Sequence, residues 1–345
     1  MLGAGARDVE RVQRLLEDYF EKPVVLLNSA RTGIFLSLLA HGLAQQDEVW
    51  VPPFLSPCVL NVIARKSVPS LSLSARTKAA LVVHQWGYPQ RMERVQAAIA
   101  GRDLLLVEDC AFSFASTYRS QRVGSFGHAA VFSFPKVFPT VLGGCLVTGD
   151  ERILGFAREY LKEQDRFGWQ AFSTFAIFPM LHTLGTRDGI WNSFIRKVNA
   201  ACYELYPDVG NPNPRVCRLF PRTRALFDEA QDQRRQNLAL FRQQFSGAGY
   251  DPAFETDSDV VPYVAPFFAP AEALELAAAA LGKQGVETGV YHFDVERDMS
   301  ASNYRKCVAV PMHQGISAER MTAIRGVLQG TMAAQGEQVL AGSAR

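Results

Sequence analysis

Three short polar segments each follow an apolar run and carry residue types that do chemistry in many enzymes. Val107-Glu108-Asp109 ends one run with two carboxylates, which could also simply cap a strand at the surface. Phe132-Ser133-Phe134-Pro135-Lys136 places a lysine among apolar residues, where it either snorkels to solvent or, if desolvated, becomes an imine-forming nucleophile. Asn28-Ser29-Ala30-Arg31-Thr32-Gly33 is either an ordinary helix N-cap or a phosphate cradle made of backbone N–H groups.

These three segments together form a set with one chemical interpretation. A phosphate cradle, a carboxylate able to pair with a pyridinium nitrogen, and a lysine able to form a Schiff base are what pyridoxal 5'-phosphate requires of a protein. The set therefore predicts pyridoxal phosphate as the cofactor. We predict no metal, because no two histidines have metal-ligand spacing.

The elements that must position these groups alternate between strand and helix. Helical patterns at 32–42 and 90–100 lie between short apolar runs that are typical of strands buried on both faces. This order predicts an α/β layer with a mostly parallel sheet and helices on both faces, whose ligands bind at strand ends. The expected strands are 23–27, 48–51, 79–83, 104–107, 129–134 and 145–148.

The pattern of predicted strands and helices changes in the second half of the chain. We predict a large domain over 1–249, a small C-terminal α+β domain over 250–333 and a frayed tail over 334–345. Residues 166–214 form an aromatic-rich insertion, in which 172–184 is a lid, a dimer surface, a membrane-surface element or a buried irregular segment. Outside the insertion we expect helices at 152–163, 223–245, 271–281 and 317–328, strands at 260–268, 286–293 and 307–311, and a loop at 211–214.

Composition excludes several classes of protein. The chain has 345 residues, 48% hydrophobic and 20% charged, which is typical of a folded globular protein of about two domains. A formal net charge of +2 is too small for general nucleic-acid binding. The six cysteines form no C-x-x-C pair, and residues 1–20 show no apolar signal region. With no apolar run long enough to span a membrane, we expect a cytoplasmic protein with reduced thiols.

Over about residues 22–330 the chain resembles the DegT/DnrJ/EryC1/StrS family of fold type I, pyridoxal phosphate-dependent enzymes, most of which are aminotransferases acting on nucleotide-linked keto sugars. Several blocks in the family's order carry this resemblance. They are Asn28-Ser-Ala-Arg-Thr32, Asp47-Glu-Val-Trp-Val-Pro-Pro-Phe54, Val83-His-Gln-Trp-Gly-Tyr-Pro89, Val107-Glu-Asp-Cys-Ala111, Val123-Gly-Ser-Phe-Gly127, Val131-Phe-Ser-Phe134, Lys136 with Gly143-Gly144, Gly285-Val-Glu-Thr-Gly289 and Val310-Pro-Met-His-Gln-Gly315.

The resemblance implies a role for each matching residue. Lys136 would form the imine with the cofactor and Asp109 would pair with its pyridine nitrogen. Ser133 and the Ala30-Arg31 turn would face the phosphate. It also implies a homodimer whose sites are completed across a two-fold interface, with the 166–214 segment near that interface.

The sequence departs from the family pattern at several of these positions. Phe112 stands where a glutamine usually bonds the ring oxygen, and Arg31 replaces a threonine of the phosphate turn. Ser133 precedes Lys136 by three positions instead of five. The aromatic residue that usually covers the ring falls on Ser56, which leaves Phe54, Trp86 or Phe112 as substitutes.

Substrate contacts are the remaining candidates. His84, His292 and His313 lie near predicted strand ends and either touch substrate or are packed or surface histidines. Asn213-Pro-Arg215 resembles the family's Asn-x-Arg, which reaches the neighbouring subunit's site. Four arginines either bind a sugar-nucleotide diphosphate or form a solvated basic face: Arg215, Arg218, Arg222 and Arg224.

Three functions follow from these observations. The first is a transaminase that converts a keto sugar into an amino sugar, with glutamate as the family's usual donor. The second is a pyridoxal phosphate enzyme that acts on a cyclitol or other small ketone, or that dehydrates its substrate; Lys136 argues against dehydration, because the family's dehydratases typically have histidine there. The third is a non-catalytic family member that serves as a binding partner, an alternative suggested by Phe112 and Ser56 and opposed by Lys136 and Asp109.

Overall fold

The computed structural model describes residues 4–140, 142–164, 210–246 and 249–343. Within these residues the main feature is a seven-stranded sheet of order β1-β9-β8-β5-β4-β2-β3. The strands β3, β2, β4, β5 and β8 run parallel, and β9 is antiparallel to both of its neighbours. The strands are β1 (Val24–Leu27), β2 (Glu48–Trp50), β3 (Val68–Ser70), β4 (Thr77–Val83), β5 (Leu105–Asp109), β8 (Ala129–Ser133) and β9 (Gly144–Val147).

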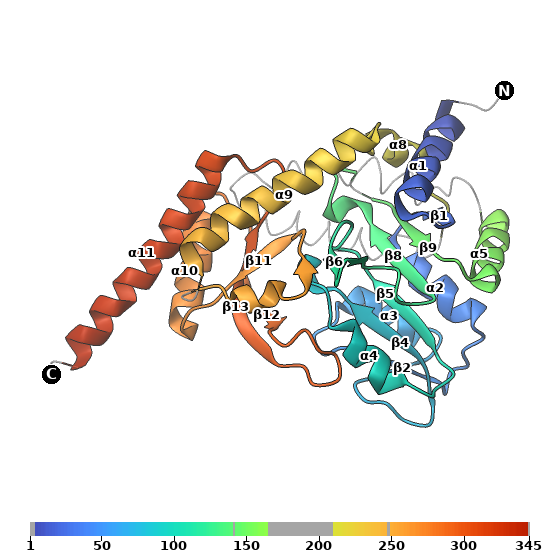
Figure 1. Cartoon of the computed structure of the whole chain (residues 1–345), viewed down its shortest axis with the longest axis horizontal. Helices are drawn as coiled ribbons and strands as arrows, with labels where there is room; N and C mark the ends of the chain where they lie inside the picture. The colour runs from blue at the N-terminus through green and yellow to red at the C-terminus, as the bar shows by residue number, and fades with distance from the viewer. Residues whose placement is uncertain (1–3, 141, 165–209, 247–248, 344–345) are drawn as a thin grey trace, which may run out of the picture.

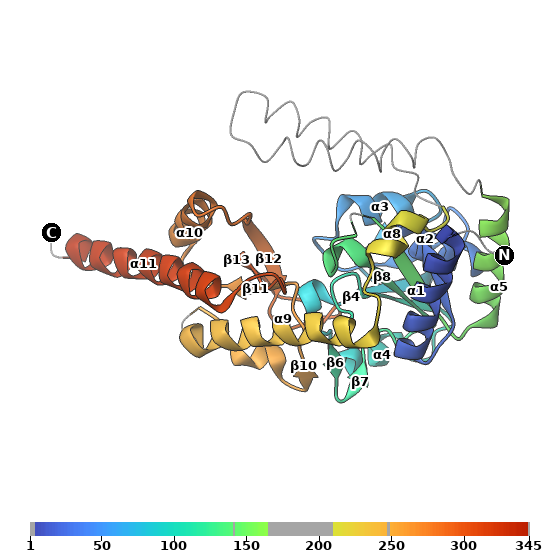
Figure 2. The ribbon, with the colours of Figure 1, turned by 90° about the horizontal axis from the view of Figure 1, so that it is seen from above.

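Helices cover both faces of this sheet, as Figures 1 and 2 show. Every residue of β1, β2, β5 and β9 is buried, which explains why these strands appear as continuous apolar runs in the sequence. One face packs on α2, α3 and α5, and the other on α1 and α4. The helices are α1 (Ala4–Phe20), α2 (Ala30–Ala40), α3 (Pro57–Ala64), α4 (Met92–Ile99) and α5 (Glu151–Glu163).

A smaller unit carries the antiparallel sheet β11-β13-β12. In a further small sheet β6 is the central strand and pairs with β10 and β7, so this sheet joins the segment after β5 to the start of the smaller unit. The remaining elements are β6 (Thr117–Tyr118), β7 (Gln121–Arg122), β10 (Ser258–Asp259), β11 (Val264–Phe267), β12 (Val290–Asp294), β13 (Tyr304–Pro311), α8 (Pro214–Leu219), α9 (Arg224–Phe245), α10 (Ala271–Lys283) and α11 (Ala318–Ser343).

Helix α9 extends from the larger unit to the smaller one (Figure 1). Phe227 near its start belongs to an aromatic core with α1 and β8, whereas Leu238, Phe241 and Phe245 belong to the core of the smaller unit. The second core therefore begins inside α9, ahead of the domain boundary that we predict at 249/250.

The predicted alternation of strand and helix is present, with differences at the ends of elements. The expected strands 260–268 and 286–293 begin later, at Val264 and Val290. Helix α11 continues to Ser343, which corrects the prediction of a frayed tail from 334.

The predicted insertion lies largely outside the described residues, so its assignment as a lid, dimer surface, membrane-surface or buried segment stays a prediction. The described residues resume at Gly210, and helix α8 begins at Pro214, where the sequence predicts a loop.

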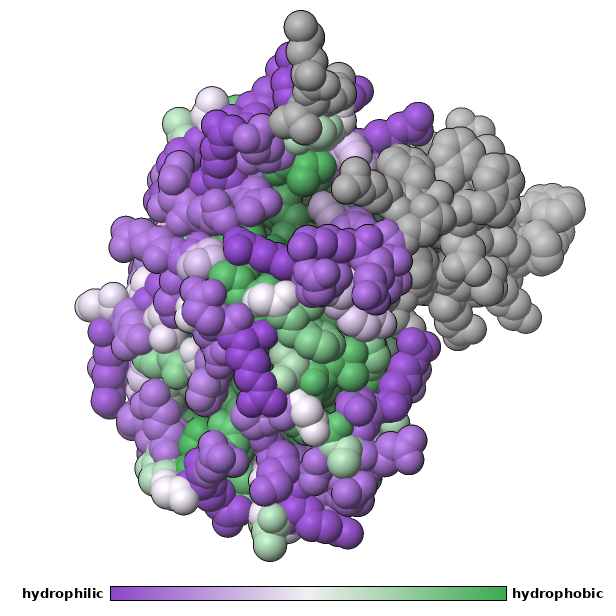
Figure 3. All heavy atoms as spheres, turned by 90° about the vertical axis from the view of Figure 1, so that its right-hand side faces the viewer, coloured by the Kyte–Doolittle hydropathy of each residue, from purple (hydrophilic) through white to green (hydrophobic). Residues whose placement is uncertain are grey.

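None of the helices in the described ranges combines the length and apolarity needed to cross a membrane. The face of the molecule on the side of α1 and α5 is mainly hydrophilic (Figure 3).

Candidate functional site

The three polar segments meet at one edge of the main sheet. Asp109 is the last residue of β5, and Lys136 ends the short 3-10 turn that follows the neighbouring parallel strand β8. On the other side of β8, Ser133 is the register partner of Gly144 in β9. Because parallel strands end at the same edge, residues more than a hundred positions apart are brought together there.

Lys136 lies in a largely apolar environment. Its Nζ atom is 5.2 Å from the centroid of the Phe112 ring and 5.8 Å from that of Tyr263, and these two rings lie 4.9 Å apart. Burial lowers the pKa of Lys136, while the nearby Cys58 and Asp109 oppose that change and Arg31 adds to it. A lowered pKa increases the neutral fraction of the amine, which is the nucleophilic form.

Asp109 is 7% exposed, and its Oδ1 atom accepts a hydrogen bond of 2.9 Å from the backbone N–H of Ala111. Burial raises the pKa of this carboxyl group, although the bond from Ala111 and the nearby His84 and Lys136 side chains act in the opposite direction. An additional cationic group beside Asp109 would offset the cost of its burial. A protonated ring nitrogen is such a group.

The turn before α2, which the sequence predicts as a phosphate cradle, is a capped helix start. Ser29 caps the helix, its Oγ atom accepting from the backbone N–H of Thr32. A Cβ atom added at Gly144 would lie 2.7 Å from the backbone N of Ala30, so only glycine lets β9 approach the turn this closely. Ser133 pairs with Gly144, which places Ser133, Ala30 and the buried Arg31 around one point at the positive end of a helix.

Of the three aromatic residues considered as a cover for a cofactor ring, Phe112 is the one beside the lysine. Phe54 has a positive φ of 57° and is 65% exposed, and its ring stacks on His292 at 4.2 Å. Trp86 also has a positive φ and stacks on Phe293 in the smaller unit. Ser56 lies at the start of α3 and contacts the Cys58 sulfur.

His84 does not serve as the predicted substrate contact, and the structure corrects that interpretation. It is fully buried, its Nδ1 atom accepts from the Gln90 backbone N–H at 3.1 Å, and its Nε2 atom lies 3.0 Å from Glu108. Both ring nitrogens are therefore occupied by the protein. His313 likewise uses Nδ1 to accept a bond from Gly315, and burial lowers its pKa.

His84 and Glu108 also form, with Cys110, a group whose ligand atoms lie within 4.8 Å of one another. The donor set does not suit a metal. Glu108 accepts three backbone N–H groups in addition to its contact with His84. Burial raises the pKa of Cys110 well above its usual value, which keeps the thiol protonated, whereas a metal binds the thiolate.

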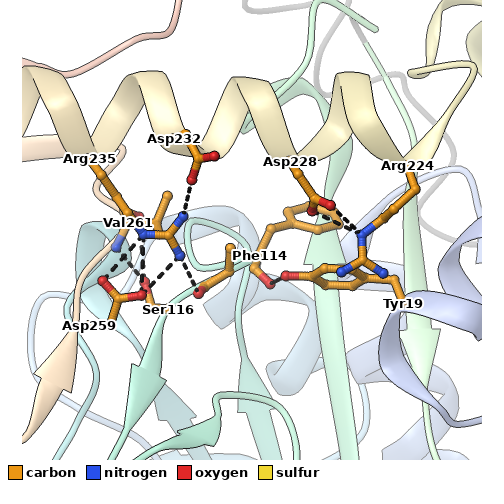
Figure 4. Close-up of polar contacts among 10 residues, drawn as sticks. Tyr19, Phe114, Ser116, Arg224, Asp228, Asp232, Arg235, Asp259 and Val261 are labelled. Carbon is orange, nitrogen blue, oxygen red and sulfur yellow. Dashed lines mark hydrogen bonds and ion pairs between the residues drawn. The ribbon is translucent and has the colours of Figure 1, made fainter.

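The arginines predicted to bind a diphosphate lie on a different side of the aromatic core from Lys136. Arg218 is ion-paired with Asp8 and Arg224 with Asp228, and Arg224 also covers the Tyr19 ring (Figure 4). An aromatic cluster separates this surface from the lysine turn; it contains Phe134, Phe138, Phe220 and Phe227. Arg222 and Arg224 line a cavity of about 390 Å³ together with α1 residues.

Asn213 caps α8, since its Oδ1 atom accepts the backbone N–H of Arg215 at 2.9 Å. Arg215 is exposed on the first turn of that helix. The approach of these two residues to a neighbouring subunit's site stays a prediction.

Two residues beside the lysine were missed by sequence reasoning. Tyr263 faces Lys136 from the segment before β11, and Arg234 on α9 binds the Lys136 backbone carbonyl. Tyr263 falls inside a run that reads as one continuous strand. Arg234 belongs to a helix whose charge pattern predicts exposure, so no local signal distinguishes it from its neighbours.

Comparison with known proteins supports these observations. Residues 6–164 match the model of the DegT/DnrJ/EryC1/StrS aminotransferase family. GDP-perosamine synthase of Escherichia coli O157:H7 is 31% identical over 147 residues, 37% of this chain and 40% of that protein. Spore coat polysaccharide biosynthesis protein SpsC of Bacillus subtilis is 28% identical over 174 residues, 44% of this chain and 45% of that protein. The chain thus matches less than half the length of these relatives.

Structural similarity extends over nearly the whole chain. The putative sugar aminotransferase Spr1654 from Streptococcus pneumoniae, in its PMP-form, superposes with a TM-score of 0.71 at 17% identity, covering 95% of this chain and 92% of that one. The aminotransferase TlmJ from Streptoalloteichus hindustanus gives a TM-score of 0.68 at 20% identity, covering 97% and 98%. The predicted fold is thereby confirmed across both units.

Proposed function

We propose that this chain, whose residues 6–164 belong to the DegT/DnrJ/EryC1/StrS aminotransferase family, is a pyridoxal phosphate-dependent aminotransferase that converts a keto sugar into an amino sugar. One observation carries the proposal. The desolvated Lys136, the buried Asp109 and the Ala30–Gly144 cradle lie at a single sheet edge. The cofactor would take its place with its phosphate at the cradle and its ring nitrogen at Asp109.

When bound, pyridoxal phosphate supplies an aldehyde for exchange of amines and a ring that withdraws electrons. The protein's own groups do the rest. Asp109 holds a proton on the ring nitrogen, because a carboxylate in this buried place is stabilised by a neighbouring cation. Lys136 in its neutral form accepts a proton at Nζ and returns it to another atom within its reach. Phe112 and Tyr263 keep water from the amine.

The nature of the substrate is the finer part of the proposal. Relatives named GDP-perosamine synthase support a nucleotide-linked sugar substrate. The family resemblance implies an amino-acid donor such as glutamate. A dehydratase, GDP-4-keto-6-deoxy-D-mannose 3-dehydratase of Escherichia coli O55:H7, is 38% identical over 79 residues. Lys136 favours transamination over dehydration. A non-sugar ketone or a cyclitol is the alternative substrate.

By the same family relationship we propose a homodimer, to be measured by light scattering; an active monomer would contradict it. We also propose that the enzyme acts in the cytoplasm. The cysteines in the described ranges support a reducing compartment, since all five are free and four are buried.

The decisive experiment is spectroscopic. Purified protein incubated with pyridoxal phosphate is expected to absorb visible light, and borohydride is expected to fix the label on Lys136, as read by peptide mass spectrometry. Lys136→Arg keeps the charge and should take no label. The loaded enzyme is then supplied with glutamate and a nucleotide-linked keto sugar, and with a free ketone as comparison. A protein that remains colourless would refute the proposal, and amination of the free ketone alone would favour the alternative substrate.

A further inference from the structure

Arg234 is a buried cation at the middle of α9 that binds only neutral oxygen atoms among the contacts described. Arg234 is only 1% exposed to solvent. It donates to four acceptors: Gln314 Oε1 at 2.8 Å from Nε, the Pro262 carbonyl at 3.2 Å from Nη1, and the Lys136 and Val137 carbonyls at 3.3 and 3.2 Å from Nη2. Three separate segments are thus joined by one guanidinium.

The energetics of this arrangement are unusual for a structural contact. Burial lowers the pKa of Arg234 to about 10, so the group remains charged at neutral pH although it is taken out of water. Burying a charge costs several kcal/mol unless hydrogen bonds replace its hydration, and a neutral side chain of similar volume often serves stability as well. What a neutral side chain does not supply is a rigid planar fork of donors that reaches several carbonyls at once.

Two of the segments that Arg234 binds carry the Lys136 amine and an aromatic ring beside it. Lys136 and Val137 end the turn after β8, while Pro262 immediately precedes Tyr263, whose ring lies 5.8 Å from Nζ. Gln314 reinforces the connection because its Nε2 atom donates to the Val137 carbonyl at 2.7 Å. The Arg234 side chain therefore binds both the backbone of the lysine turn and the backbone next to Tyr263.

We propose that Arg234 is a positioning residue: it fixes the lysine turn against the Tyr263 segment, and so sets where the Lys136 amine stands and how well it is shielded from water. The proposal rests on the proposed function, in which Lys136 is the reacting amine. Arg234 acts through the Lys136 backbone and not on substrate. A displacement of the amine by about 1 Å is enough to slow a reaction about a hundredfold.

The next residue on α9 provides a matched control. Arg235 is ion-paired with Asp232 and Asp259 (Figure 4), and it donates to the Ala115 carbonyl. None of these three partners belongs to the lysine turn. Its side chain is 33% exposed. Arg235→Met therefore removes an equal charge from the same helix without touching the Lys136 backbone.

The experiment measures the reactivity of Lys136 in the cofactor-free protein. Competitive acetylation by acetic anhydride over a range of pH, read by peptide mass spectrometry, gives the pH at which the Lys136 amine is half reactive. Arg234→Lys keeps the charge but offers a single nitrogen, and Arg234→Met removes the charge. We expect both to raise the half-reactive pH by about one unit toward that of a free lysine, because the turn relaxes toward solvent. Arg235→Met should leave it unchanged.

Several outcomes would overturn the proposal. A wild-type profile in both Arg234 variants would make the residue purely structural. A shift in Arg234→Met alone would show that its charge matters and its hydrogen bonds do not. If the Arg234 variants fail to fold, Gln314→Met, which removes one partner of Arg234 and the bond to Val137, must shift the profile in the same direction; an unchanged profile there contradicts the proposal.

The same samples separate this inference from the proposed function. Trapping of pyridoxal phosphate on Lys136 with borohydride should be about tenfold slower in the Arg234 variants than in the wild type. A wild-type Lys136 that is acetylated at an unusually low pH but never takes the cofactor would refute the proposed function, and the acetylation profiles would still test Arg234.

Discussion

The Nε2 atom of His84 lies 3.0 Å from Oε2 of Glu108, and neither side chain is exposed to solvent. His84 follows β4, and Glu108 is the penultimate residue of the neighbouring parallel strand β5, just before Asp109. Glu108 also accepts the backbone N–H groups of Gly124, Phe126 and Gly127, each at 2.7 Å. Through these contacts the buried pair holds the loop that leads into β8.

The first prediction concerns this pair. Glu108→Gln replaces one acceptor oxygen with an N–H donor that faces other donors, so we expect a loss of about 2–4 kcal/mol in the free energy of unfolding. Urea denaturation measures it. Glu151→Gln, on the exposed first turn of α5, is the control. Equal stability of the two variants would show that the Glu108 contacts contribute nothing.

The second prediction is that replacement of the lysine stabilises the cofactor-free protein. Burial lowers the pKa of Lys136, so the folded state binds its proton less well than the unfolded state does, and the charged amine destabilises the fold at neutral pH. Lys136→Met should raise the free energy of unfolding by about 1 kcal/mol at pH 7. The gain should shrink as the pH rises toward 10.5, the ordinary pKa of lysine. A loss of stability at pH 7 would contradict this.

The third prediction separates stability from turnover at Asp109. Burial raises its pKa, so the carboxyl group contributes most to stability at low pH, and that contribution is lost as the pH rises through the folded-state pKa. Asp109→Asn should therefore stabilise the cofactor-free protein at pH 7, measured by thermal unfolding. In the loaded enzyme the same change should lower turnover on the order of a thousandfold, because the ring nitrogen loses its partner. Near-normal turnover would show that Asp109 has another role.

The fourth prediction tests the phosphate cradle. Gly144→Ala would bring a Cβ atom to 2.5 Å from the Phe132 carbonyl oxygen and 2.7 Å from the Ala30 nitrogen, so the turn before α2 must move. We expect pyridoxal phosphate to bind at least about tenfold more weakly, as measured by equilibrium titration. Gly155→Ala, in α5 with no atom near its Cβ, should bind the cofactor normally and gain about 0.5–1 kcal/mol in stability. Unchanged affinity in Gly144→Ala would place the phosphate elsewhere.

Local patterns in the sequence determined the order of elements and the place of each motif along the chain. Strands buried on both faces are visible as apolar runs, and amphipathic helices as apolar residues that recur every three or four positions. Both patterns arise because each buried position favours an apolar residue whatever its distant neighbours are. For the same reason Asp109, Lys136 and the Ala30-Arg31 turn could be assigned to strand ends.

The tertiary structure alone decided which side chains meet. Arg234 and Arg235 are adjacent arginines of one charged helix, yet one binds the Lys136 carbonyl and the other pairs with surface carboxylates. His84 is withdrawn from any substrate by Glu108 and Gln90, and Tyr263 lies beside Lys136 although 126 residues of the chain separate them. Such contacts depend on how the two units pack, and a packing interaction between distant segments leaves no periodic or compositional trace in either of them.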